Sequence, residues 1–143
     1  IDMGDPTGRA KRQKLDDLVS EFPRPDERFA GLPYRHGWYV ANVGASHPLA
    51  FNSIAHLDLK TGARKILTFA PGDYVGEPIF VPRSASAPEG DGHLIVLVYR
   101  AATDTSDLLV LEAQDINAAP TATIHMPRRV PSGFHGNWAA GVG

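Results

Sequence analysis

The sequence predicts an all-β fold made of repeated four-stranded units. Short runs of branched and aromatic residues recur at nearly even spacing, and turn-forming residues separate them. Helix signals are weak after residue 20, and residues 115–119 have room for one turn at most. The chain also repeats itself at intervals of 54 to 58 residues.

The expected strands differ in how deeply they should be buried. Residues 54–59 alternate apolar and polar side chains, and Lys60-Thr61-Gly62 predicts a tight turn into a returning strand at 63–69. Residues 93–99 are almost all apolar and branched, which predicts a well-buried strand after a loop at 84–92. Further strands are expected from Glu21 onward and at residues 37–42, 79–81, 108–111 and 121–125.

Corresponding strands lie one repeat apart along the chain. Each repeat holds a short first strand, a long apolar second strand, and a third and fourth strand that form a hairpin. This is the anatomy of a β-propeller blade. The matching pairs are 21–23 with 77–80, 37–40 with 93–96, 54–58 with 108–112, and 63–67 with 121–125.

A third repeat begins at residues 133–138, shortly before the sequence ends. Two blades and one inner strand cannot close a propeller, which typically has four to eight blades. We therefore expect residues 21–143 to be the C-terminal portion of one larger propeller, with the remainder of that propeller as its partner. The alternative is a fragment that docks on another chain. In a closed ring the last strand would be the innermost strand of a blade completed by the N-terminus.

Composition limits the possible partners and sites. Lys and Arg number 14 against 16 Asp and Glu, and this near balance argues against nucleic acid as a partner. The chain has no Cys, which excludes disulfides, thiolate metal sites and Cys nucleophiles. No apolar run approaches the length of a membrane helix, and the acidic start does not resemble a signal peptide. We expect a cytoplasmic protein, while membrane association stays open.

Residues 1–20 are expected to be a connecting segment. They carry a basic cluster, Arg9, Lys11, Arg12 and Lys14, with acidic residues on both sides. The cluster is either a localisation or phosphate-binding patch or, as we favour, part of a solvated linker.

Three ionisable residues share one position of the repeat. Glu21, Glu77 and His135 stand at the start of three successive inner strands, in apolar or Pro-rich surroundings. Inner strands line the axis of a propeller, where an unpaired charge is costly, so these side chains must be paired or serve a metal. A carboxylate can accept a hydrogen bond from the imidazole nitrogen that does not bind metal. From spacing alone, core polar residues satisfied by backbone groups are the alternative.

The same residues carry a family resemblance. The chain resembles the C-terminal part of the carotenoid cleavage oxygenases, a group that includes the bacterial lignostilbene dioxygenases. Each motif is weak alone, but together they follow the family's order and cover nearly the whole chain after residue 14. The matching stretches are 21–24, 26–29, 34–35, 76–83, 89–99, 107–111 and 127–138, the last reading PRRVPSGFHGNW.

The resemblance implies a seven-bladed propeller that holds one non-haem Fe(II) on its axis through four His, three of them steadied by Glu. By motif, His135 matches the last iron ligand, and Glu77 and Glu21 match two of the steadying carboxylates. Adjacent strands favour Glu77 as the partner of His135, which leaves Glu21 for a His outside this segment. The remaining histidines fall outside the ligand motifs and are expected on the surface or in strands: His36, His47, His56, His93 and His125.

The reaction implied by the resemblance is cleavage of a conjugated carbon–carbon double bond of a carotenoid, apocarotenoid or stilbene by O2, with carbonyl products. With one of four iron ligands, the 143 residues alone are expected to be inactive. One alternative is a non-catalytic propeller fragment that acts as a binding or scaffold module. Another is a calcium site in the acidic loop 89–92, although the loop lacks the alternating oxygen ligands that hard cations prefer.

Overall fold

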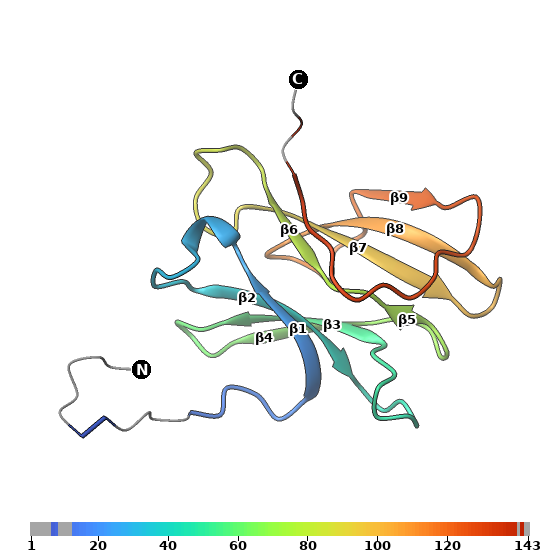
Figure 1. Cartoon of the computed structure of the whole chain (residues 1–143), viewed down its shortest axis with the longest axis horizontal. Coiled ribbons are helices and arrows are strands. Elements are labelled where there is room, and N and C mark those ends of the chain that lie inside the picture. The colour runs from blue at the N-terminus through green and yellow to red at the C-terminus, as the bar shows by residue number, and fades with distance from the viewer. Residues whose placement is uncertain (1–6, 9–12, 140, 142–143) are drawn as a thin grey trace.

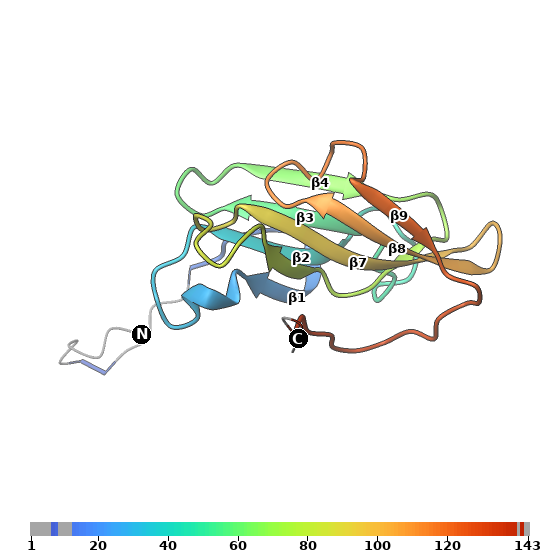
Figure 2. The ribbon, with the colours of Figure 1, turned by 90° about the horizontal axis from the view of Figure 1, so that it is seen from above.

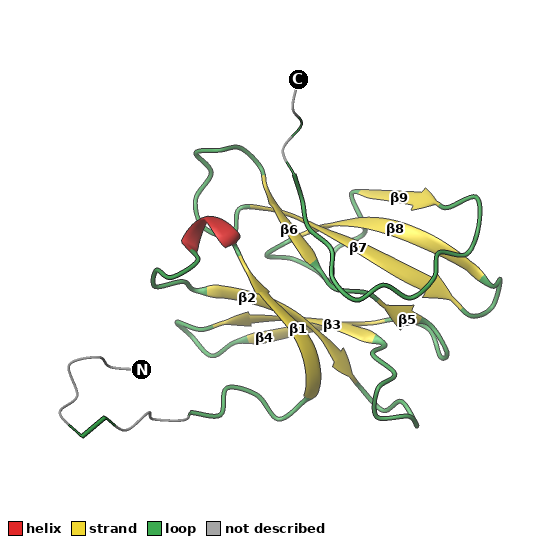
Figure 3. Ribbon diagram, in the orientation of Figure 1, coloured by secondary structure: helices red, strands yellow, loops and turns green. Residues whose placement is uncertain are grey.

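Two antiparallel sheets make up the structure, a computed structural model that describes residues 7–8, 13–139 and 141 (Figures 1 and 3). The first sheet has the order β1-β2-β3-β4, and the second has the order β5-β7-β8-β9 with β6 also paired to β7. The strands are β1 (Val19–Pro25), β2 (His36–Asn42), β3 (Ser53–Asp58), β4 (Arg64–Thr68), β5 (Tyr74–Val75), β6 (Ile79–Pro82), β7 (Gly92–Arg100), β8 (Thr105–Glu112) and β9 (Ala122–His125).

In the first sheet sequential strands pair, as the repeat predicts, and in the second sheet β5 and β6 both pair with β7, which is followed in order by β8 and β9. The hairpin between β3 and β4 closes where Gly62 donates its N–H to the carbonyl of Asp58. Gly62 has φ +74°, a left-handed conformation that glycine adopts at little cost, so the predicted turn at 60–62 is confirmed. The predicted strands at 37–42, 54–59, 63–69, 79–81, 93–99, 108–111 and 121–125 are all present with small shifts of their ends.

The main core lies between the two sheets, which lie one above the other in Figure 1 and overlap when seen from above in Figure 2. Trp38 of β2 is fully buried there, with its ring stacked on Phe80 of β6 at 4.9 Å between centroids. Its indole N–H donates to the carbonyl of Ala113 at 2.7 Å. Trp38 therefore packs on the second sheet and also provides the hydrogen-bond donor for the buried carbonyl of Ala113.

Burial alternates along β7, where Leu94, Val96 and Val98 are buried but Ile95 and Leu97 are only half-buried. A continuous apolar run predicts burial on both faces, whereas here only the face toward the first sheet is fully covered. The second sheet thus has one apolar face that the described part of the chain leaves partly open.

Two features differ from the predicted strands. The inner strand of the second sheet is split into β5 and β6, and Glu77 lies in the interruption between them. Residues 133–138, expected as the first strand of a third unit, carry no strand assignment and run alongside β6 instead (Figure 1). Because strands are defined by their ladder partners, this segment cannot be assigned as one when no partner strand flanks it.

The N-terminal region also differs in detail. β1 begins at Val19, inside the segment expected to be a linker. Of the basic cluster, Arg9, Lys11 and Arg12 lie outside the described residues, and the exposed Lys14 pairs with Asp17. No helix long and apolar enough to cross a bilayer occurs within residues 7–8, 13–139 and 141.

A buried histidine pair joins β2 to β3. Nδ1 of His36 lies 2.9 Å from Nε2 of His56, and both side chains are almost inaccessible to solvent. Burial and mutual repulsion of the protonated forms lower the pKa of His56 to about 4, and burial also lowers the pKa of His36. Both rings are therefore held neutral in the folded protein at pH 7.

Acidification is expected to destabilise the fold through this pair. In the unfolded chain His56 takes up a proton below its ordinary pKa of 6.5, whereas in the folded protein it does so only near pH 4. The free energy of unfolding should therefore keep its full value above pH 6.5 and fall as the pH drops from 6.5 to about 4. His56→Gln, which keeps a hydrogen-bonding group but does not titrate, should flatten this fall, whereas His47→Gln in an exposed loop should not. Urea unfolding of the full-length protein at pH 5 and pH 7.5 measures this loss of stability in each variant. Equal losses in His56→Gln and wild type would contradict the assignment.

Candidate metal-ligand site

The buried carboxylate of Glu77 organises the site. Its side chain is 5% exposed, and it lies between β5 and β6 next to the segment that carries His135. Oε1 lies 3.3 Å from Nδ1 of His135, and Oε2 accepts the backbone N–H of Gly136 at 2.9 Å. Both carboxylate oxygens therefore bind neighbouring residues of one short segment, which confirms the expected contact between Glu77 and His135.

This contact determines which nitrogen of His135 is free. An ionised carboxylate only accepts hydrogen bonds, so the proton in the contact belongs to Nδ1 of the imidazole. Nε2 then carries the lone pair, which is the arrangement typical of a metal-binding histidine held by a carboxylate. The side chain of His135 is 64% exposed, so the ring is accessible on the side away from Glu77.

A small apolar cavity adjoins this pair. It has a volume of about 150 Å³, and Glu77 and His135 supply its ionisable groups. The rest of its lining comes mainly from apolar side chains and glycines, among them Ile79, Ile95 and Leu97. The imidazole thus stands at the border between an apolar wall and open space.

Glu21 does not join Glu77 and His135. It is exposed, it forms no side-chain hydrogen bond or ion pair with any described residue, and it lines a different cavity. Within the described residues Glu21 therefore makes no contact with Glu77 or His135, and its place beside the axis stays a prediction. A free, exposed carboxylate is nevertheless compatible with the expectation that Glu21 serves a histidine elsewhere.

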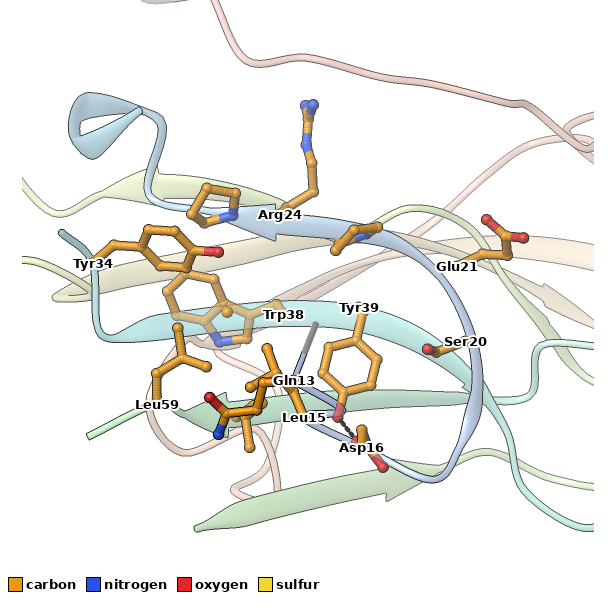
Figure 4. A pocket seen from close by; sticks show the side chains of 14 residues that line it. Gln13, Leu15, Asp16, Ser20, Glu21, Arg24, Tyr34, Trp38, Tyr39 and Leu59 are labelled. Atoms are coloured by element: carbon orange, nitrogen blue, oxygen red, sulfur yellow. Dashed lines mark hydrogen bonds between the residues drawn. The ribbon is translucent and has the colours of Figure 1, made fainter. Parts of the chain in front are cut away.

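The cavity next to Glu21 lies on the other side of the first sheet and is larger, about 640 Å³ (Figure 4). Tyr39 of β2 points into it and donates its hydroxyl to Asp16, which also pairs with Arg64. Burial and the hydrogen bond to Asp16 raise the pKa of Tyr39 well above its ordinary value. These contacts tie residues before β1 to the sheet, and they present no catalytic group to the cavity.

The other histidines occupy the strands and surface positions expected of them. His125 pairs with Asp107 at 2.8 Å and is exposed, and His93 in β7 lies 3.5 Å from Glu112. The carboxylates of the acidic loop are also engaged, since Glu89 accepts the backbone N–H of Arg35 and Asp91 pairs with Arg83. These contacts engage one oxygen of each carboxylate, and the loop belongs to no group of three or more possible metal ligands among the described residues.

The residues present fit a metal site in part. His135 offers one neutral imidazole nitrogen with its partner carboxylate in place, which is a suitable donor for Fe(II). Among residues 7–8, 13–139 and 141, no group of three or more His, Cys, Asp or Glu side chains could hold a metal ion. The geometry therefore supplies one ligand and its partner rather than a complete site.

Known proteins share both sequence and fold with this chain. Lignostilbene-alpha,beta-dioxygenase isozyme III of Sphingomonas paucimobilis is 39% identical over 139 residues, which cover 91% of this chain and 28% of that enzyme. The crystal structure of Pseudomonas brassicacearum lignostilbene dioxygenase matches with a TM-score of 0.83 and 38% identity over 90% of this chain and 29% of that one. A cobalt-substituted apocarotenoid oxygenase of Synechocystis matches with a TM-score of 0.81 and 37% identity over 89% and 26%.

These matches confirm the predicted fold class, because the two sheets correspond to part of a seven-bladed β-propeller. The chain spans less than a third of the length of these relatives. A family model described as retinal pigment epithelial membrane protein matches residues 1–140. The chain therefore belongs to the retinal pigment epithelial membrane protein family, the carotenoid oxygenases and lignostilbene dioxygenases that its motifs predict.

Proposed function

We propose that the full-length protein containing this chain is a non-haem Fe(II) dioxygenase. It would cleave a conjugated carbon–carbon double bond of a carotenoid, apocarotenoid or stilbene, with one oxygen atom of O2 going to each carbonyl product. The observation that carries the proposal is the bond between Glu77 and Nδ1 of His135, which leaves Nε2 for a metal. The names of the relatives, lignostilbene dioxygenase and apocarotenoid oxygenase, support the substrate class.

His135 would hold the iron through Nε2, and Glu77 would fix the orientation of its ring and raise its basicity. Three further histidine ligands would come from outside this chain, and Glu21 would steady one of them. The bound iron would supply the activation of O2. The residues of this chain would hold His135 in place and contribute apolar wall beside it, and none of them is proposed to transfer a proton.

The remainder of the propeller is the proposed partner of this chain. The half-buried residues Ile95 and Leu97 and the large cavity beside Tyr39 lie on the two outer faces of the pair of sheets. Neighbouring blades on both sides would cover them, because repeat units bury their apolar faces against one another. We also propose a cytoplasmic location, which fractionation of cells producing the full-length protein would test.

Iron content and product analysis of the full-length protein test the proposal. We expect one iron per protein and conversion of a stilbene or an apocarotenoid to two carbonyl compounds under air, with no conversion under argon. Incubation with 18O2 should label both products. Protein that folds but neither binds iron nor cleaves these substrates would overturn the proposal in favour of a binding or scaffold module.

Glu77→Gln should weaken metal binding more than folding. The amide keeps the shape of the carboxylate but loses its charge, so the imidazole becomes a poorer donor, and we expect a loss of about 10- to 100-fold in metal affinity or activity. The free energy of unfolding should fall by about 1 kcal/mol, the net value of one hydrogen bond, because the amide keeps only one of the two acceptor oxygens. Glu27→Gln is a matched control, because Glu27 pairs with the same Arg24 but is half exposed. Equal effects of the two substitutions on iron affinity would contradict the role of Glu77.

A further inference from the structure

An irregularity in β1 lies next to the segment that carries His135. Glu21 pairs with Val40 and Arg24 with Trp38, so three steps along β1 oppose two steps along β2. This one-residue bulge resets the alternation of the strand. Val40 and Trp38 share the face toward the second sheet, and the bulge therefore places Arg24 on that face opposite Trp38.

Phe22 sits inside this bulge with a strained backbone. Its φ is +53°, a left-handed conformation that is a genuine outlier for a bulky side chain and costs about 1–3 kcal/mol. The ring of Phe22 meets the imidazole of His135 edge to face, with 5.4 Å between centroids and 84° between planes. It makes the same kind of contact with Phe134 at 5.4 Å. The strained residue thus packs against the proposed ligand and its neighbour.

Arg24 reaches the same segment with its guanidinium group. Nη2 donates to the carbonyl of Gly136 at 2.7 Å, and Nε lies 3.6 Å from Oε1 of Glu77. Glu77 in turn binds the N–H of Gly136 and Nδ1 of His135. Arg24 and Glu77 together therefore satisfy both backbone polar groups of Gly136, and both are largely buried.

This matters because residues 133–138 lack strand partners within the described chain. The hydrogen bonds that hold their backbone to the two sheets come from the side chains of Glu77 and Arg24. Glu77 accepts the N–H of Gly136, and Arg24 donates to its carbonyl. Without Arg24 this carbonyl would lose its hydrogen bond to the sheets. The position of His135 depends on both.

We propose that Arg24 and Phe22 are positioning residues for His135. The bulge in β1 aims them at the segment 134–136, where Arg24 fixes the backbone and the Glu77 carboxylate and Phe22 limits rotation of the imidazole. The inference rests on the proposed function where it concerns metal binding, but not where it concerns the placement of the segment. The test therefore uses two readouts: metal affinity for the role in metal binding, and hydrogen exchange for the placement of the segment.

Arg24→Gln in the full-length protein is the principal test. Glutamine cannot reach the carbonyl of Gly136 and the carboxylate of Glu77 together, so hydrogen exchange of the peptide covering 133–138 should accelerate in metal-free protein. The affinity for Co(II), measured by competition with a chelator, should fall by about 3- to 10-fold, less than for loss of the carboxylate itself. Arg24→Lys keeps the charge but not the two-sided contact, and it should recover only part of the affinity.

Two further variants separate positioning from general stability. Arg83→Gln removes an arginine that pairs with Asp91 and Glu112 at the far end of β6, and it should change neither readout. Phe22→Leu keeps apolar volume but loses the aromatic edge, and it should lower Co(II) affinity while folding normally. It provides the test if Arg24→Gln does not fold.

The outcomes distinguish this inference from the proposed function. Unchanged exchange at 133–138 in Arg24→Gln, or a Co(II) affinity no lower than that of Arg83→Gln, overturns the inference. If His135→Ala loses Co(II) and neither Arg24→Gln nor Phe22→Leu weakens it, the inference alone fails. If His135→Ala binds Co(II) as tightly as wild type, the proposed function fails, and exchange at 133–138 still decides whether Arg24 anchors the segment.

Discussion

His135→Ala in the full-length protein is expected to lower iron affinity by more than about 100-fold, beyond the upper range for loss of an outer partner such as Glu77. The substitution removes a donor atom itself, and no group of three or more His, Cys, Asp or Glu side chains among the described residues could hold the metal in its place. Iron content after dialysis against a weak chelator measures the effect. Alkene cleavage should fall with the bound iron.

The same substitution should have only a small effect on folding. His135 is 64% exposed, so its removal should cost about 1 kcal/mol, the net value of its hydrogen bond to Glu77. Loss of iron without loss of the thermal transition of the metal-free protein would therefore indicate a ligand. His125→Ala is the matched control, since His125 also has Nδ1 against a carboxylate, that of Asp107. Iron retained by His135→Ala, or lost equally in both variants, would refute the assignment.

The repeat explains why the contact between Glu77 and His135 could be predicted from sequence. The two residues stand 58 positions apart, the length of one blade, so equivalent points on neighbouring inner strands meet. The strands themselves followed from branched and aromatic runs, because those side chains pack well on a pleated surface. Both inferences use local pattern and period, which a sequence carries directly.

The contact between Arg24 and the segment of His135 could not be predicted from the repeat. Equivalence in the repeat assumes equal strand geometry, but β1 has a bulge at 21–24 where the second unit has a break between β5 and β6. The break contains Gly76 and Pro78 and the bulge contains Pro23, residues that favour interruptions of a strand, but Phe22 adopts a left-handed conformation that phenylalanine rarely takes. The contact of Arg24 with Gly136 spans 112 positions, so local pattern does not predict it.

The buried pair of His36 and His56 shows a second limit of sequence pattern. Both residues were expected in strands or on the surface, and both are in strands, but their pairing depends on the register between β2 and β3. The ten residues from 43 to 52 connect these strands, and a connection of that length does not fix a register by itself. The register sets His56 opposite Trp38, where the two rings stack at 5.4 Å.

Trp38→Ala should cause the largest loss of stability among core substitutions, about 3–5 kcal/mol. The ring is fully buried between Phe80 on one side and His56 on the other, so its removal opens a void between the two sheets. Urea unfolding of the full-length protein, followed by far-UV circular dichroism, measures the change.

Trp38→Phe separates packing from hydrogen bonding at this position. Phenylalanine keeps an aromatic face for Phe80 but leaves the carbonyl of Ala113, a fully buried residue, without its 2.7 Å donor. An unsatisfied buried acceptor costs about 1–3 kcal/mol, so this variant should lie between wild type and Trp38→Ala. A loss below about 1 kcal/mol in Trp38→Ala would mean that the sheets are not held together at this contact.

Trp38 also affects the site through the distance between the two sheets. The chain runs from Glu77 directly into β6, which carries Phe80, so the sheet separation that Trp38 sets also fixes how closely Arg24 of β1 can approach Glu77. Trp38→Ala should therefore weaken iron binding as well as folding.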